Sequence, residues 1–124
     1  MTVIPSEPSA TIADCLFCKM AHGEIRVEKL HEDELLFSVR DINPRAPVHL
    51  MVIPKEHIPS VREVRPEHGA LLARMIMVAD QVAQKEGVAE KGYRLAFNEG
   101  EDSGQSVFHI HMHILGGCRL GPEA

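Results

Sequence analysis

Three histidines alternate with apolar residues near the end of the chain, in the segment His109-Ile110-His111-Met112-His113-Ile114. Side chains two positions apart in an extended chain lie on the same face, roughly 6–7 Å apart. The alternation therefore predicts a strand with three imidazoles on one face and three apolar side chains packed on the other. Because imidazole is a nucleophile, proton carrier and metal ligand near neutral pH, this face is the first candidate for a functional site.

Two kinds of chemistry fit three imidazoles on one face. One is a three-histidine metal centre that keeps an open coordination position, as in zinc hydrolases. The other uses the imidazoles directly, with one ring attacking the substrate and its neighbours stabilising the transition state. The spacing of the histidines alone does not separate the two.

The loop immediately before the histidines carries residues suited to an oxyanion. It spans residues 99–105, contains Gly100 and Gly104, ends at Gln105 and is followed by Ser106. Backbone N–H groups and short polar side chains can approach phosphate oxygens closely in such a loop. Taken alone, the loop also fits an ordinary hairpin turn. Next to a histidine face, it favours a phosphate-containing substrate.

Length, charge and cysteine content limit the class of protein. The chain has 124 residues, and we expect a flexible leader over residues 1–10 followed by a single domain over residues 11–124. A net charge of −5 argues against binding nucleic acid through a basic surface. No apolar run approaches the roughly 18 residues of a membrane helix. Residues 1–10 have neither the basic nor the apolar region of a secretory signal, so we expect none. The three cysteines form no disulfide framework, so we expect a cytoplasmic protein.

The periodicity of apolar residues predicts a short helix, two strands, a long helix and two more strands. The expected ranges are residues 11–22, 35–41, 48–53, 66–86, 93–98 and the histidine segment. Thr11 is the expected N-cap of the short helix, and residues 31–34 are expected to form a polar turn. The long helix has an i, i+3, i+4 apolar stripe, with Pro66 in its first turn and Gly87 after its end. This order predicts an α+β fold with a mostly antiparallel sheet.

The histidine segment matches the His-x-His-x-His-x-x motif of the histidine triad (HIT) superfamily, in which x is apolar. Further segments match in order and spacing, at residues 41–42, 46–49, 52–58, 98–100, 104–108 and 115–117. The chain thus resembles the Hint branch, the nucleoside phosphoramidases, from about residue 15 to residue 117. The resemblance implies the histidine triad fold and a homodimer joined by the long helix and the Tyr93 strand. It also implies hydrolysis of purine nucleoside 5′-phosphoramidates, such as adenylyl-amine adducts, without a catalytic cofactor.

The resemblance assigns catalytic roles to four residues. It implies that His111 attacks the α-phosphorus and forms a nucleotidyl-histidine intermediate, from which water releases the nucleoside monophosphate. The other ring nitrogen of His111 would donate to a main-chain carbonyl, which selects the tautomer. His113 and His49 would lie beside the phosphate, and Ser106 would donate toward the leaving group.

The resemblance also implies a set of substrate-binding residues. Asp41 would accept the ribose hydroxyls, and the phosphate would lie near Asn98, Gly104, Gln105 and Val107. The apolar slot for the purine would consist of Leu16, Phe17, Met20, Val39, Ile42 and Met51. Judged from the pattern alone, most of these apolar side chains are core residues, Asp41 caps a strand end, and His49 is a packed core histidine.

The segment Cys15-Leu16-Phe17-Cys18 is the second feature with chemical content. In a protein of a reducing compartment, Cys-x-x-Cys is typical of zinc or redox sites. With no second such pair, the other ligands of a Cys₂His₂ site could be His57 and His109. HIT superfamily members with cysteines at this place resemble this arrangement and hold a structural zinc. The alternative is two buried free thiols.

Three alternatives to a phosphoramidase remain open from the sequence. A dinucleoside polyphosphate hydrolase would keep the fold and change the substrate. A three-histidine metal hydrolase would change the chemistry, and a regulatory module would bind a nucleotide without hydrolysing it. The short tail after Gly117 and the Gly116-Gly117 pair favour the phosphoramidase branch.

Overall fold

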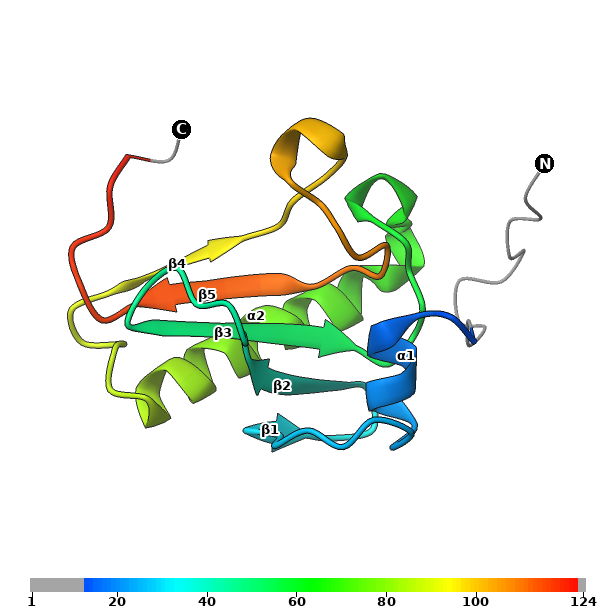
Figure 1. The fold of residues 1–124 in the computed structure, drawn as a ribbon, viewed down its shortest axis with the longest axis horizontal. Coiled ribbons are helices and arrows are strands. Elements are labelled where there is room, and N and C mark those ends of the chain that lie inside the picture. The colour runs from blue at the N-terminus through cyan, green and yellow to red at the C-terminus, as the bar shows by residue number, and fades with distance from the viewer. Residues whose placement is uncertain (1–12, 123–124) are drawn as a thin grey trace.

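The computed structural model describes residues 13–122, so the leader predicted over residues 1–10 and the N-cap predicted at Thr11 lie outside it. Within those residues, five strands form one antiparallel sheet in the order β1-β2-β3-β5-β4 (Figure 1). The strands are β1 (His31–Glu32), β2 (Leu36–Arg40), β3 (Val48–Pro54), β4 (Tyr93–Ala96) and β5 (Met112–Gly116). The predicted α+β fold with a mostly antiparallel sheet is confirmed.

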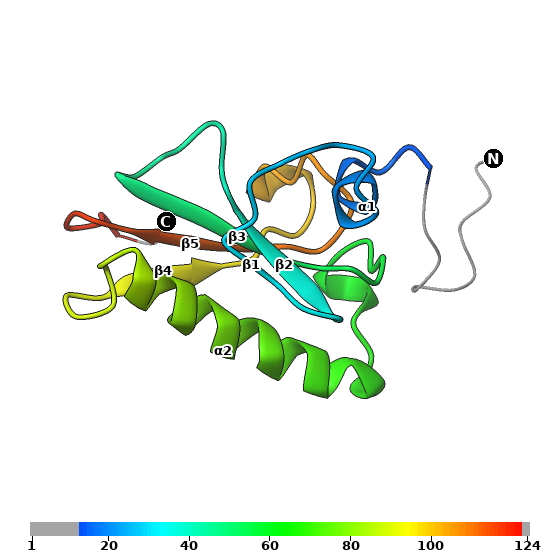
Figure 2. The same cartoon turned by 90° about the horizontal axis from the view of Figure 1, so that it is seen from below.

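The two faces of the sheet are covered differently. The long helix α2 (Gly69–Lys85) lies across one face, and the short helix α1 (Leu16–Ala21) lies on the other (Figure 2). The main core fills the space between α2 and the sheet and includes Leu36, Leu50, Val52, Met75, Val78, Ala79, Val82, Met112 and Ile114. A second apolar cluster under α1 contains Cys15, Phe17, Cys18, Phe37, Val39, Met51 and Ile53. Strand β3 is therefore buried on both faces, as its nearly continuous apolar run predicts.

Both helices begin later than the periodicity predicts. Helix α1 begins at Leu16, because the Sγ atom of Cys15 accepts a hydrogen bond from the backbone N–H of Cys18 and caps the first turn. The stretch Pro66–His68 is a separate 3₁₀ turn, and the α-helix proper begins at Gly69. Its first turn is preceded by a side-chain cap in which the Nδ1 atom of His68 accepts from the backbone N–H of Arg65.

Only the second half of the histidine segment belongs to the sheet, and His109 lies in a bend. Strand β5 begins at Met112, which pairs with Val52 of β3. The same register would place Ile110 opposite Pro54, which has no N–H to donate. The backbone N–H of Ile110 instead donates to the carbonyl of Ile58 at 2.6 Å. The alternation still holds, since Ile110, Met112 and Ile114 are buried on the apolar side.

The expectation of a turn at residues 31–34 is wrong for its first half. His31 and Glu32 form β1 and pair with Ser38 and Phe37 of β2. A strand of two polar residues at a sheet edge has no period-2 apolar pattern, so the sequence carries no signal for it. The bend that follows is held by Asp33, whose Oδ1 atom accepts from the backbone N–H groups of Leu35 and Leu36.

Candidate active site

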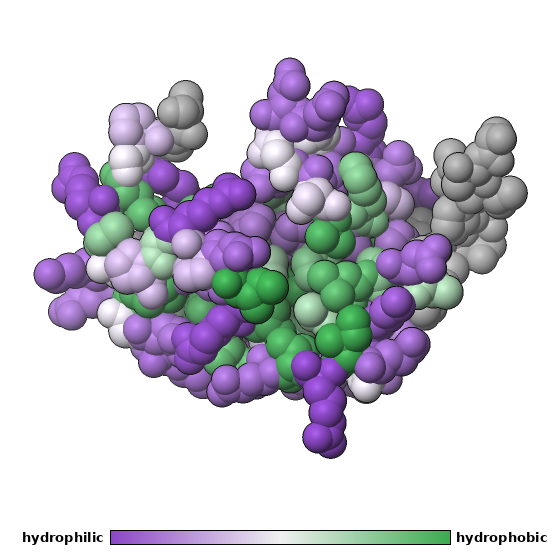
Figure 3. Space-filling model, in the orientation of Figure 1, coloured by the Kyte–Doolittle hydropathy of each residue, from purple (hydrophilic) through white to green (hydrophobic). Residues whose placement is uncertain are grey.

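A pocket of about 270 Å³ opens on the face of the sheet opposite α2. Figure 3 views this face and shows apolar side chains gathered beside α1. The predicted site residues that line the pocket are Leu16, Phe17, Met20, Val39, Asp41, Ile42, Met51, Asn98, Gly104, Gln105, Ser106, Val107, His111 and His113. Its outer wall is open to solvent, since Ile42 is 89% exposed and Leu16 is 42% exposed. The structure thus combines an apolar slot and a polar end in one cavity.

His111 lies at the polar end of the pocket, and one of its two ring nitrogens makes a hydrogen bond within the protein. Its Nδ1 atom lies 2.8 Å from the carbonyl oxygen of His109, and only a protonated nitrogen can bond to a carbonyl. In the neutral ring the proton is therefore on Nδ1, and Nε2 carries a free lone pair. Burial lowers the pKa of His111 below its usual range, which favours this neutral form. The edge contacts of the ring with Phe17 and His113, both at 5.0 Å between centroids, restrict its rotation.

His49 and His113 form a hydrogen-bonded chain behind the pocket. The backbone N–H of Arg45 donates to Nδ1 of His49 at 3.0 Å, so neutral His49 carries its proton on Nε2. That proton faces Nδ1 of His113 at 2.9 Å and the Oδ2 atom of Asp41 at 3.3 Å. Accepting at Nδ1 leaves neutral His113 with its proton on Nε2. His113, which lines the pocket, can thus act as a hydrogen-bond donor.

The pKa values in this chain of residues favour neutral rings. Burial, together with the charge that His111 or His49 would carry when protonated, lowers the pKa of His113 to about 4. Burial also lowers the pKa of His49, although the carboxylate of Asp41 opposes the shift. His49 itself is buried beneath the pocket and does not line it, so it lies one hydrogen bond away from any bound group.

The loop before the histidines is braced by its own side chains. The Oε1 atom of Gln105 accepts from the backbone N–H of Gly100 at 2.8 Å, and its Nε2 group donates to the carbonyl of Pro59 at 3.3 Å. Gly104 adopts a left-handed φ of 87°, which a residue with a Cβ atom rarely adopts. The hydroxyl of Ser106 is exposed at the pocket and makes no hydrogen bond to the other residues that the structure describes. It is thus available to a substrate.

The four predicted metal ligands converge below this pocket. Cys15, Cys18, His57 and His109 are all buried, and their ligand atoms lie within 4.8 Å of one another. The Nδ1 atom of His109 lies 3.2 Å from Sγ of Cys15 and 3.1 Å from Nδ1 of His57, and Sγ of Cys18 lies 3.3 Å from Nδ1 of His57. The edges of a tetrahedral Cys₂His₂ zinc site are about 3.3–3.8 Å, as zinc–ligand bonds of ~2.0–2.3 Å require. The donor set and its spacing therefore fit zinc.

The Nε2 atom of His109 also makes the hydrogen bond expected of a zinc-binding histidine. Its Nε2–H donates to the carbonyl of Pro54 at 2.7 Å, which leaves the lone pair of Nδ1 facing the cysteines. Burial lowers the pKa of His109 to about 4, so the ring stays neutral, as a metal ligand must. Because His109 faces the cysteines and His113 faces His49 and Asp41, the described residues do not bring the three triad imidazoles to one ion. This arrangement disfavours the three-histidine metal hydrolase.

Comparison with known proteins identifies the family. A family model described as "Scavenger mRNA decapping enzyme C-term binding" matches residues 14–118. The purine nucleoside phosphoramidase of Escherichia coli (strain K12) is 47% identical over 109 residues, which cover 88% of this chain and 92% of that protein. The chain belongs to the histidine triad (HIT) family.

Solved structures agree with this assignment. A HIT family hydrolase from Legionella pneumophila Philadelphia 1 is 46% identical, with a TM-score of 0.85 over 87% of this chain and 96% of that one. A HIT family hydrolase from Clostridium thermocellum is 45% identical, with a TM-score of 0.88 over 91% and 98%. A zinc-bound histidine triad family protein from Mycobacterium smegmatis is 30% identical, with a TM-score of 0.72 over 89% and 78%. The fold predicted from the HIT motif is confirmed.

Four pocket residues of this HIT protein have no place in the sequence-based prediction. They are Val27, Arg40, Asn43 and Arg45. Asn43 and Arg45 follow Asp41 in a loop with two prolines, so their nearness to the site could have been suspected from the position of Asp41. Val27 lies in a segment without regular secondary structure and carries no comparable signal.

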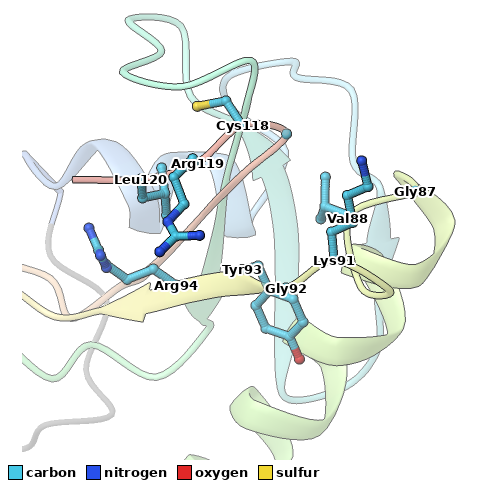
Figure 4. A pocket seen from close by; sticks show the side chains of 10 residues that line it. Gly87, Val88, Lys91, Gly92, Tyr93, Arg94, Cys118, Arg119 and Leu120 are labelled. Carbon is cyan, nitrogen blue, oxygen red and sulfur yellow. The ribbon is translucent and has the colours of Figure 1, made fainter. Parts of the chain in front are cut away.

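A wider depression of about 1060 Å³ lies where β5 leaves the sheet and β4 enters it (Figure 4). Three of the residues that line it are basic: Lys91, Arg94 and Arg119. The others are Gly87, Val88, Gly92, Tyr93, Gly117, Cys118 and Leu120. Its lining contains no histidine or carboxylate and none of the predicted catalytic residues. The smaller histidine pocket is therefore the candidate active site.

Among residues 13–122, no helix has the length and apolar character needed to cross a membrane.

Proposed function

We propose that this HIT-family nucleotide hydrolase cleaves purine nucleoside 5′-phosphoramidates at the α-phosphorus, with His111 as the nucleophile. The observation that carries the proposal is the hydrogen bond from Nδ1–H of His111 to the carbonyl of His109. It leaves the Nε2 lone pair of a neutral imidazole at the polar end of a pocket sized for a small ligand. The similarity to a protein named purine nucleoside phosphoramidase supports the choice of substrate.

The reaction proceeds in two displacements at phosphorus. In the first, Nε2 of His111 forms a bond to phosphorus while the bond from phosphorus to the leaving amine nitrogen breaks. The hydroxyl of Ser106 supplies a proton toward the departing amine. In the second, a water oxygen bonds to phosphorus and the bond to Nε2 breaks. The proton that the water loses returns to the Ser106 oxygen and restores its hydroxyl, and the nucleoside monophosphate leaves. The Nε2–H of His113 donates to a non-bridging phosphate oxygen as charge builds there.

The rest of the pocket supports a nucleoside on the other side of the phosphate. The apolar slot from α1, β2 and β3 offers side chains to both faces of a flat purine, with Leu16 and Ile42 at its mouth. Asp41 sits between the slot and the histidines. Its Oδ1 atom accepts from the backbone N–H of Asn43 at 2.8 Å, which fixes the carboxylate while lone pairs remain for ribose hydroxyls.

Two substrates and one variant test this function. Wild-type protein should hydrolyse an adenosine 5′-phosphoramidate faster than a diadenosine polyphosphate, both followed by chromatography of the released nucleotide. The variant His111→Ala should fold, by circular dichroism, and lose at least about 1000-fold in kcat/KM. Faster cleavage of the polyphosphate would favour that alternative substrate instead. Binding without any turnover would favour the regulatory module.

We further propose that the Cys15, Cys18, His57 and His109 cluster holds a structural zinc ion. The converging lone pairs, the burial of all four side chains and the zinc-bound relative support this assignment. Bound there, zinc would act by cross-linking α1, the segment after β3 and the start of the histidine segment. Elemental analysis of purified protein should find one zinc per chain, and Cys18→Ser should lower that content.

We also propose that the protein is a cytoplasmic homodimer joined along β4 and α2. Strand β4 is an edge of the sheet formed by the described residues, so the hydrogen-bonding groups on its outer side are available to a second copy. Helix α2 presents Ile76 and Met77, which are 53% and 56% exposed. The cysteine cluster needs reduced thiols, which fits a cytoplasmic location. Light scattering should give about twice 13.8 kDa, and Ile76→Glu should shift the mass to that of one chain.

A further inference from the structure

The metal cluster and the nucleotide pocket are built from the same short segment of chain. Cys15 and Cys18 are ligand candidates, and the two residues between them, Leu16 and Phe17, line the pocket. Any constraint on the two sulfur atoms therefore acts on the pocket wall within one helical turn. Cys15 also caps α1, so its position sets where that helix begins.

Phe17 contacts both sites with one ring. Its ring centroid lies 5.8 Å from that of His109, in the cluster, and 5.0 Å from that of His111, the proposed nucleophile. Both contacts are edge-to-face, at interplanar angles of 87° and 75°. Such contacts stabilise a specific ring orientation. Phe17 is only 3% exposed, so a change in the position of either histidine must be accommodated by its neighbours.

His109 joins the two sites a second time, through its backbone. Its Nδ1 atom faces the cysteines, and its carbonyl oxygen accepts the proton on Nδ1 of His111. The carbonyl that selects the reactive tautomer of His111 thus belongs to a candidate metal ligand. Ligation at Nδ1 of His109 would restrict the position of its backbone carbonyl, because the Nε2–H of the same ring also donates to the carbonyl of Pro54.

From these two connections we propose that Phe17 and the carbonyl of His109 are positioning groups that make zinc and nucleotide bind cooperatively. This proposal rests on the proposed function and on the zinc site. Zinc orders the cluster, the cluster holds Phe17 and the His109 carbonyl, and these present His111 and the base slot in their binding geometry. A nucleotide that needs the same geometry must strengthen zinc binding by the same factor, because coupling between two sites is reciprocal.

The test measures both directions of the coupling, with adenosine 5′-monophosphate (AMP) as the nucleotide. Calorimetry gives the affinity of zinc-loaded and metal-stripped protein for AMP. Competition with a chelating dye gives the affinity for zinc with and without saturating AMP. We expect both ratios to be at least about fivefold and equal within error. Ratios near one in a protein that binds AMP overturn the proposal.

A second measurement does not need folded metal-free protein. With cobalt(II) in place of zinc, the visible absorption bands report ligand geometry. AMP should shift these bands and slow the removal of cobalt by a chelator. An unchanged spectrum and unchanged removal rate at saturating AMP overturn the proposal.

Phe17→Leu tests the ring contact, and Phe37→Leu is the matched control. Phe37 is fully buried in the same apolar cluster, and in the described part of the chain its ring stacks on neither histidine. Phe17→Leu should retain one metal per chain but reduce the coupling ratio, whereas Phe37→Leu should preserve the ratio. Equal ratios in both variants remove Phe17 from the proposal. Because these are binding measurements, cooperative binding without hydrolysis of phosphoramidates would contradict the proposed function alone.

Discussion

Which ring nitrogen carries the proton in each neutral active-site histidine follows from the hydrogen bond that its Nδ1 atom makes. His111 donates to a carbonyl and keeps Nε2 free, whereas His49 accepts from a backbone N–H and passes its own proton toward His113. The rings of His111 and His113, whose centroids lie 5.0 Å apart, therefore take opposite roles. His111 offers a lone pair, and His113 donates a proton. The motif predicts which residues gather at the site. It cannot predict the backbone N–H of Arg45, which selects the tautomer of His49.

The lowered pKa values make a prediction about the pH dependence of catalysis. His111 attacks only when neutral, and burial lowers its pKa below the ordinary value of 6.5. Protonation, and with it loss of the nucleophile, therefore requires a lower pH than for free imidazole. The acid limb of kcat/KM should lie below pH 6.5, with activity level above it. A limb with an apparent pKa at or above 6.5 would contradict a buried neutral nucleophile.

The link from His49 to His113 makes a second prediction. His49→Leu removes the Nε2–H that faces His113, so His113 loses the partner that keeps its own proton on Nε2. We expect kcat to fall by about 10- to 100-fold while the affinity for AMP changes little. His22→Leu, at an exposed histidine on the surface, is the control and should behave as wild type. An equal loss of AMP affinity and kcat would mean that His49 shapes the pocket as a whole.

At the level of elements, the predicted boundaries fail where capping or pairing depends on the fold. Helix α1 begins at a thiol cap, and cysteine is not among the usual N-cap residues, so sequence rules place the start at Thr11 instead. Strand β5 begins only at Met112, because the partner strand offers Pro54 beyond that point. The long helix is predicted well because its apolar stripe follows directly from packing on the sheet.

The conformation of the loop at residues 99–105 can be tested by replacing one glycine with alanine. Gly104→Ala should destabilise the protein by about 1 kcal/mol, because a Cβ atom is strained at a left-handed φ. It should also weaken AMP binding, since Gly104 lines the pocket. Gly69→Ala is the control. It lies at the start of α2 with open space around it, so it should leave AMP binding unchanged and raise stability by up to about 1 kcal/mol. Urea unfolding and calorimetry measure both effects.

For the whole molecule, the order β1-β2-β3-β5-β4 explains why the site forms at all. Pairing of β3 with β5 brings Met51 opposite His113, although 62 positions separate them in sequence, the difference between 113 and 51. Helix α2 covers one face of these strands and leaves the other face for the pocket and the cluster. The antiparallel sheet could be predicted from the elements. The strand order is not predicted, because periodicity within a segment says nothing about which strands pair.

The buried histidines also predict how stability depends on pH. His113 has a folded pKa of about 4 against an ordinary value of 6.5, and the pKa of His49 is lowered in the same direction. Between these limits the unfolded chain binds more protons, so acid favours unfolding. The free energy of unfolding should be highest above pH 6.5 and fall by about 2–3 kcal/mol on acidification toward pH 4. Urea titrations at several pH values test this, and His113→Asn should reduce the slope.

The claim on which the whole account depends is that His111 forms a covalent bond to phosphorus. The most direct measurement is single turnover of an adenosine 5′-phosphoramidate, quenched with denaturant at alkaline pH and followed by peptide mass spectrometry under conditions that preserve phosphorus–nitrogen bonds. We predict an adenylyl group on His111 that appears and decays within one turnover and is absent from His111→Ala. An active wild-type enzyme that accumulates no adduct under trapping conditions, or carries it on another residue, would contradict the account.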